Sequence, residues 1–230
     1  MTTNTDSSTT TPLLAEDVLL TLLSPASGTI GGEGTLFYVL GGAVLTELAA
    51  TGAVSVQDAG LRGAIVTADG EAPTDSLLRD AWDYTREKPR GAQTVIAAVG
   101  PQLREPLLER LVERGDVHRE VRKLFGPLTR TRLTVPETSR RGAIVTRLRA
   151  VLVDGVEPDA RTGSIGALVS ASGALPTLDA EIPWGFAVAT RAKALEGGDW
   201  GADAAGEAVT RTMTAIVVNS MVAAMVMTPR

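Results

Sequence analysis

The stretch LFYVLGGAVLTELAATGAV, residues 36–54, decides the fold class, because Glu47 is the only charged residue among its nineteen. Such a stretch either crosses a membrane or forms a helix inside a globular protein. A carboxylate in the middle of a membrane span costs roughly 2.5 kcal/mol or more, and the nearest basic residue that could flank a span is Arg62. The glycine pair Gly41–Gly42 also suits packing against other helices better than contact with lipid. We therefore predict that residues 36–54 form the buried central helix of a globular domain.

In the rest of the chain, apolar residues recur at the intervals typical of amphipathic helices, in segments that turn residues separate. The predicted helices are residues 13–23, 74–86, 93–99, 102–114, 139–153, 159–172, 183–195 and 209–227. Alternating apolar and polar residues around turn signals predict two β-hairpins, at residues 54–67 and 117–135. The fold class that follows is mainly α, a single domain over residues 13–230 with two small hairpins, preceded by a disordered polar tail at residues 1–12.

Residue composition excludes several kinds of active site. The chain has no cysteine, so it has neither disulfides nor thiolate chemistry. Its single histidine, His118, has no evident carboxylate to orient it, and we expect a structural or exposed role. The glycine-rich loop at residues 28–34 lacks the Gly-Lys-Ser/Thr ending of a phosphate-binding P-loop. It is either a connector between helices or a cradle whose backbone N–H groups hold an anionic headgroup, and we expect no cofactor and no bound metal.

Charge is distributed unevenly along the chain. Residues 101–150 hold 12 Arg and Lys but only 6 Asp and Glu, although the whole chain carries a net charge of −5. Either these basic residues pair with carboxylates from the acidic remainder, or they meet an anionic partner such as a membrane surface. The overall acidity and an aromatic content of 3% argue against nucleic acid as a partner. The alternative to a membrane is a protein-interaction module whose basic residues 101–150 bind an acidic partner protein.

Five stretches of the chain, taken in order, carry a family resemblance: LLAEDVLLTLL (13–23), GGAVLTELAATGAV (41–54), LRE...LLERLVERGDV (103–117), FGPLT (125–129) and RAVLVDGVEPDARTGSIGALVSA (149–171). In this order they resemble the Golgi phosphoprotein 3 family and its prokaryotic relatives over about residues 13–227. The resemblance implies a central bundle of hydrophobic helices, wrapped by amphipathic helices, with a protruding hairpin. It also implies a non-enzymatic, cytoplasmic protein that associates reversibly with the cytoplasmic face of a membrane. Eukaryotic members bind phosphatidylinositol 4-phosphate in a basic pocket and act as adaptors for Golgi glycosyltransferases.

The resemblance assigns the lipid pocket to four positions of this chain. The family's tryptophan falls at Gly32, and its three basic positions fall at Gly41, Pro101 and Arg104. Because only Arg104 remains basic, we expect binding that follows total negative charge more than headgroup identity and that weakens with salt. The expected lipid-binding residues, whose arginines would form one anion-attracting surface, are Arg104, Gly32, Gly41, Arg130, Arg132, Arg140 and Arg141.

Partners also follow from the resemblance. The expected partners are anionic membrane lipid, a membrane enzyme or another protein client, and a second copy of the chain. The family's hairpin is involved in self-association, and it corresponds here to residues 117–135, which are rich in arginine.

Overall fold

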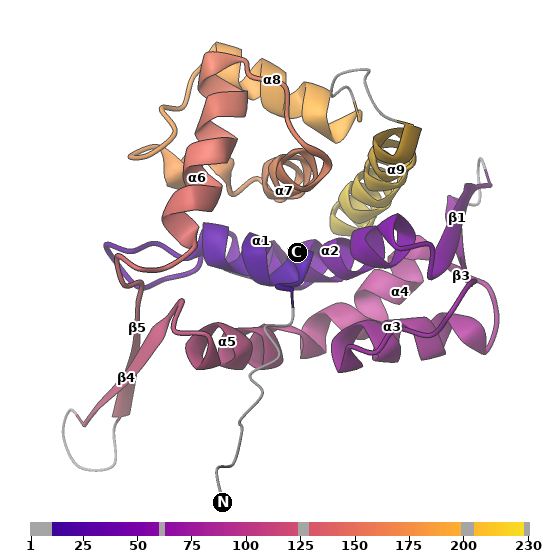
Figure 1. Cartoon of the computed structure of the whole chain (residues 1–230), viewed down its shortest axis with the longest axis horizontal. Helices are drawn as coiled ribbons and strands as arrows, with labels where there is room; N and C mark the ends of the chain where they lie inside the picture. The colour runs from indigo at the N-terminus through magenta and orange to yellow at the C-terminus, as the bar shows by residue number, and fades with distance from the viewer. Residues whose placement is uncertain (1–10, 60–62, 124–128, 199–204, 228–230) are drawn as a thin grey trace, which may run out of the picture.

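Helices make up most of this computed structural model (Figure 1). The residues that it describes are 11–59, 63–123, 129–198 and 205–227. Their α-helices are α1 (Leu14–Leu22), α2 (Leu36–Ala50), α3 (Ser76–Arg86), α4 (Ala92–Val99), α5 (Arg104–Glu113), α6 (Arg141–Arg149), α7 (Ala160–Ala171), α8 (Phe186–Glu196) and α9 (Ala205–Met227). Shorter helical segments are η1 (Glu33–Thr35), η3 (Gly100–Gln102), η4 (Ala150–Asp154) and η5 (Leu175–Leu178). The prediction of a mainly α fold is confirmed, whereas residues 1–10 of the expected tail lie outside the described residues.

Helix α2 lies at the centre of the molecule, and α1, α4, α7 and α9 pack around it (Figure 1). Its side chains Leu40 and Val44 are fully buried. The prediction of a buried central helix is confirmed, although the helix ends before residue 54 because Gly52, with φ of +73°, turns the chain into the first strand. None of the helices that the structure describes combines the length and hydrophobicity needed to cross a membrane.

The glycine pair of α2 allows two other helices to approach closely. A Cβ atom at Gly41 would lie 3.1 Å from the carbonyl oxygen of Ile96 in α4. A Cβ atom at Gly42 would lie 3.2 Å from the side chain of Leu168 in α7. Both distances are shorter than ordinary van der Waals contact, so the pair serves packing, as the sequence indicated.

Glu47 joins α2 to α1. Its Oε2 accepts a hydrogen bond of 2.7 Å from the backbone N–H of Leu14, at the helix end where main-chain N–H groups lack partners within the helix. Burial raises the pKa of Glu47 above its ordinary value of 4.5, and the hydrogen bond from Leu14 opposes this shift in part. The one charge of the central segment therefore caps a neighbouring helix.

The first predicted hairpin is confirmed and belongs to a three-stranded sheet. Strand β1 (Val54–Asp58) pairs antiparallel with β2 (Ala64–Ala68), and β2 pairs with β3 (Arg90–Gly91). The third strand has two residues, which is too short for a period-two pattern, so the sequence analysis did not predict it.

The second predicted hairpin is also confirmed. Strand β4 (His118–Lys123) pairs antiparallel with β5 (Thr129–Thr134), and the pair projects from the helical body beside α5 (Figure 1). His118 is exposed at the start of β4, in agreement with the expectation. The turn at residues 124–128 lies outside the described residues.

Candidate functional site

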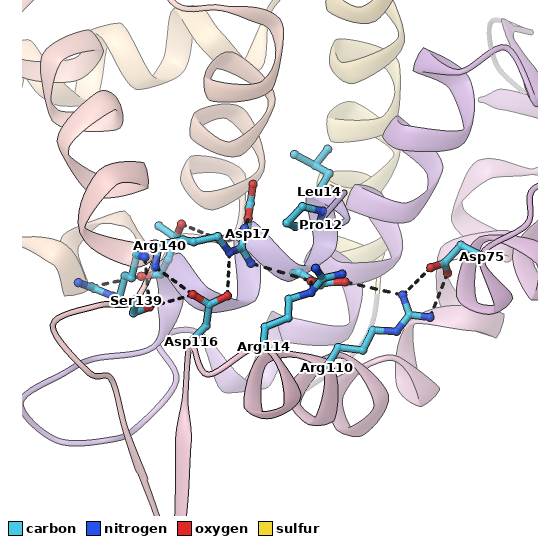
Figure 2. Close-up of polar contacts among 12 residues, drawn as sticks. Pro12, Leu14, Asp17, Asp75, Arg110, Arg114, Asp116, Ser139 and Arg140 are labelled. Atoms are coloured by element: carbon cyan, nitrogen blue, oxygen red, sulfur yellow. Dashed lines mark hydrogen bonds and ion pairs between the residues drawn. The ribbon is translucent and has the colours of Figure 1, made fainter. Parts of the chain in front are cut away.

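A network of buried ion pairs surrounds Glu16 and Asp17 of α1 (Figure 2). These residues are almost fully buried, with 0% and 4% of their surface exposed. Asp17 accepts hydrogen bonds from Arg140 Nη1 at 2.5 Å and from Arg161 Nε at 2.7 Å. Glu16 Oε2 lies 3.0 Å from Arg114 Nε. Because buried charges cost free energy unless they are paired, these arginines stabilise the carboxylates of α1.

Further ion pairs extend the network to Asp75 at the start of α3 and to Asp116, two residues before β4. Arg110 Nη1 lies 2.6 Å from Oδ2 of Asp75, which is also the N-cap of α3. Arg140 Nε lies 2.7 Å from Asp116 Oδ2. Burial alone would lower the pKa of Arg140, but the hydrogen bond to Asp116 and the charge of Asp17 raise it above the ordinary value. The network therefore holds together α1, α3, α5 and the start of α6.

Arg141 is also turned inward, with a side chain that is 3% exposed. Its guanidinium donates to both carboxylate oxygens of Glu181 and, through Nη2, to the carbonyl oxygen of Thr21 at 3.3 Å. The expectation that Arg140 and Arg141 belong to one anion-attracting surface is therefore wrong for Arg141, whereas Arg140, whose side chain is 32% exposed, is already paired with Asp17 and Asp116. Arg141 lies three residues before the buried Ile144 on the same face of α6, and that position directs it toward the core.

An open pocket of about 460 Å³ lies between α5, the β4–β5 hairpin and the glycine-rich loop. Its lining residues are Gly28, Thr29, Ile30, Glu33, Arg104, Glu105, Leu108, Arg119 and Leu133. Arg119 and Leu133 are partners in the register of the hairpin, so their side chains lie on the same face of it. The pocket thus collects side chains from segments that are distant in sequence.

The charged side chains of this open pocket are paired but reach solvent. Arg104 Nε lies 2.9 Å from Glu33 Oε1, and Arg104 also pairs with Glu105. Arg119 Nη2 lies 3.1 Å from Glu105 Oε2. The carboxylate side chains of Glu33 and Glu105 are 55% and 57% exposed. Exposed pairs contribute at most about 1 kcal/mol, so an incoming anion displaces these carboxylates at low cost.

The glycine-rich loop forms one wall of the open pocket, and two of its backbone donors there are already hydrogen-bonded to residues just before the loop. The N–H of Gly28 donates to the carbonyl oxygen of Ser24 at 2.8 Å, and the N–H of Thr29 donates to Ser27 Oγ at 3.3 Å. Gly28 has φ of +70°, and a Cβ atom at this position would lie 2.2 Å from the carbonyl oxygen of Leu133. The loop therefore acts as a connector that packs against the hairpin.

Ion pairing and hydrogen bonding are the chemistry that the open pocket offers. A guanidinium presents paired N–H donors to a phosphate or carboxylate group, and both Arg104 and Arg119 line the pocket. In the described part of the chain, no cluster of histidine and carboxylate side chains is arranged to hold a metal ion.

Sequence comparison places this fold in a family. A model of the family described as Golgi phosphoprotein 3 (GPP34) matches residues 14–212. The chain belongs to this family. Among curated proteins, no match to the chain was found. The family match runs from the start of α1 into α9, so the resemblance noted in the sequence is confirmed for the family and for the mainly helical fold.

The structure separates the positions that the Golgi phosphoprotein 3 resemblance assigned to a lipid pocket. Arg104 lines the open pocket, whereas Gly32 lines a neighbouring cavity of about 620 Å³ together with Arg141. Gly41 is buried in α2 against Ile96 and is not among the residues that line these two cavities. A larger side chain at position 41 would meet the backbone of α4.

Arg130 and Arg132 both lie on β5. Arg132 is exposed and is the register partner of Glu120. Because side chains alternate along a strand, Arg132 points away from the hairpin face that carries Leu133 and Arg119. The side chain of Arg130 lies outside the described residues. The expected arginines therefore do not share one surface, and Arg104 is the expected residue that lines the open pocket.

Three residues of the open pocket were missed by reasoning from the sequence: Glu33, Glu105 and Arg119. Arg119 follows the buried Val117 by two positions, so strict alternation in the expected strand would have placed both on one hairpin face. Glu105 belongs to the alternating acidic and basic residues of the predicted helix 102–114, a pattern typical of a solvent-exposed helix face. No local signal marked Glu33, because its contact with Arg104 spans 71 positions of the chain.

Proposed function

We propose that this Golgi phosphoprotein 3 family member is a non-enzymatic peripheral membrane protein that binds anionic phospholipid headgroups. The proposed binding site is the open pocket beside the β4–β5 hairpin. Family membership supports the proposal, because the resemblance implies lipid binding through a basic pocket in eukaryotic members. We also propose that a membrane enzyme or another protein is its client, by the same resemblance.

One observation carries the proposal: Arg104 and Arg119 meet at a pocket of about 460 Å³ that is open to solvent. Their present partners Glu33 and Glu105 are more than half exposed. A phosphate group that enters the pocket therefore exchanges with carboxylates that solvent already screens. The arginines around α1 cannot make this exchange, because the carboxylates that they meet are enclosed.

The charge balance of the pocket predicts weak and unselective binding. The charges of the two arginines and the two glutamates that line it cancel, so the pocket exerts little net electrostatic attraction on a distant anion. Glycine at positions 32 and 41 supplies neither the aromatic wall nor the basic group that the family resemblance assigns there. We expect affinity to follow the total negative charge of the membrane and to fall as salt shortens the Debye length.

Vesicle flotation tests this proposal. At matched surface charge, phosphatidylinositol 4-phosphate should show little advantage over other acidic lipids, and raising salt from about 50 to 500 mM should abolish most binding. Arg104→Gln should weaken binding about tenfold, since it removes a charge-assisted contact worth roughly 1.5 kcal/mol. Arg147→Gln, which removes an exposed charge from α6, should bind nearly as wild type.

Two outcomes would contradict the proposal. The first is the absence of flotation with any anionic vesicle. The second is an equal loss of binding in Arg104→Gln and Arg147→Gln. Preference for an acidic peptide over anionic vesicles would favour the protein-interaction alternative instead.

A further inference from the structure

Residues 183–187, Pro-Trp-Gly-Phe-Ala, form an uncharged run that is exposed along its whole length. Trp184 is 44% exposed and Phe186 is 91% exposed. Elsewhere in the described part of the chain, the large exposed apolar side chains are the separate valines Val121, Val156 and Val226. A run of consecutive exposed apolar residues is unfavourable in a globular protein unless it has a function.

The run is held by the turn that precedes it. Asp179 Oδ1 accepts a hydrogen bond of 2.6 Å from the backbone N–H of Trp184. Ile182 is fully buried, and its N–H donates to the carbonyl oxygen of Leu178 at 2.7 Å. Phe186 is the first residue of α8. A backbone that is ordered before binding presents both aromatic side chains, which lowers the entropic cost of using them in a contact.

The run follows, in sequence, residues that line a cavity next to the proposed headgroup site. Leu178 and Glu181, which come just before the run, line the cavity of about 620 Å³. Thr29 and Ile30 line that cavity as well, and they also line the open pocket that contains Arg104. The two cavities therefore share a wall in the glycine-rich loop, and the run begins two residues after Glu181 of the second cavity.

We propose that Trp184 and Phe186 insert into the boundary between the headgroups and the acyl chains of an anionic membrane. This inference rests on the proposed lipid-binding function and adds an apolar membrane contact to the headgroup contact. Tryptophan and phenylalanine are favoured in this layer of a membrane. A stable protein interface buries about 800 Å² on each partner, which a five-residue turn does not provide alone.

Binding to vesicles of phosphatidylcholine and phosphatidylserine tests the inference with the variant Trp184→Ala/Phe186→Ala. We expect this variant to bind about tenfold more weakly than wild type, equivalent to about 1.4 kcal/mol. The remaining binding should keep its salt dependence, because Arg104 is unchanged. The matched control Val156→Ala/Val226→Ala also removes two exposed apolar side chains, and it should bind with near wild-type affinity.

Tryptophan fluorescence provides a second measurement with a conservative variant. To remove the emission of the third tryptophan, the experiment uses Trp200→Phe, which keeps Trp82 and Trp184. Lipids with brominated acyl chains should quench the emission of this vesicle-bound variant. Adding Trp184→Phe should preserve binding and abolish the quenching. Trp82 is a suitable internal reference, because it is 7% exposed and lies against the core.

The outcomes separate this inference from the proposed function. Vesicle binding that depends on Arg104 but is unchanged in Trp184→Ala/Phe186→Ala, without quenching through Trp184, would overturn the insertion of the run alone. The absence of binding to any anionic vesicle would overturn both proposals. A double variant that binds vesicles as wild type but loses self-association or a protein contact would also overturn insertion, because the run would then belong to a protein interface.

Discussion

Two arginine clusters in this molecule use the same residue types in opposite surroundings. Around α1, Arg140 and Arg161 meet Asp17, which is 4% exposed (Figure 2). Beside the hairpin, Arg104 and Arg119 meet Glu105, whose side chain is 57% exposed. Because the two clusters differ in the burial of their carboxylates, the number of arginines in a segment does not predict a binding surface. The burial of the carboxylate that each arginine meets decides whether the pair stabilises the fold or remains available to an anion.

The basic segment at residues 101–150 is divided between these two uses. Seven of its arginines have a carboxylate partner in the described part of the chain: Arg104, Arg110, Arg114, Arg119, Arg140, Arg141 and Arg149. Most of the apparent excess of positive charge is therefore matched by nearby carboxylates. The pairs of Arg104, Arg119 and Arg149 have exposed carboxylate partners, and the first two of these arginines line the open pocket.

The largest expected effect comes from the buried cluster. Asp17→Asn removes the charge that Arg140 and Arg161 share, and we expect the free energy of unfolding to fall by about 3 kcal/mol. Glu105→Gln makes the same chemical change in the open pocket, and it should alter stability by less than about 0.5 kcal/mol. Urea denaturation of both variants measures the difference. Equal effects would mean that burial does not distinguish the two clusters.

A smaller effect is expected when an arginine is replaced without loss of charge. Arg141→Lys keeps the charge but loses the guanidinium that donates to both oxygens of Glu181, and we expect a cost of about 1–2 kcal/mol. Arg104→Lys should leave the midpoint of thermal unfolding almost unchanged, because its pairs are exposed. If Arg141→Lys were as stable as wild type, charge alone rather than paired hydrogen bonding would hold this contact.

The smallest effect concerns Glu47, a partly buried carboxylate whose described hydrogen bond comes from the backbone N–H of Leu14. Burial raises its pKa, so ionisation costs stability: the cost is absent below pH 4.5, the ordinary value, and appears as pH rises through the higher folded-state pKa. Glu47→Gln still accepts from the N–H of Leu14 and cannot ionise. We expect it to match wild type in acid and to be slightly more stable at pH 7.

A comparison of denaturation curves at pH 4 and pH 7 checks this expectation. If wild type were more stable than Glu47→Gln at pH 7, the attraction between the carboxylate and the N-terminus of α1 would outweigh the cost of burying the charge.

The sequence predicted the fold better than the site, and the reason is physical. Residues 36–54 form a nearly continuous apolar stretch and the 117–135 hairpin alternates around a turn, and both patterns are local in the sequence. Ion pairs join residues that are distant in the chain: Arg140 and Asp17 are 123 positions apart, and Arg104 and Glu33 are 71 apart. Composition gave the number of arginines in the basic segment, but their partners depend on how the helices pack.

We propose that anionic headgroups bind the open pocket in competition with Glu33 and Glu105. A comparison of the vesicle affinities of Glu33→Gln/Glu105→Gln and Glu71→Gln/Glu157→Gln at about 100 mM salt tests this competition. Both variants lose two exposed negative charges. We predict that the pocket variant binds at least about tenfold more tightly than the control, because its arginines are free to contact phosphate. Equal affinities would show that only net charge matters, and would contradict binding at this pocket.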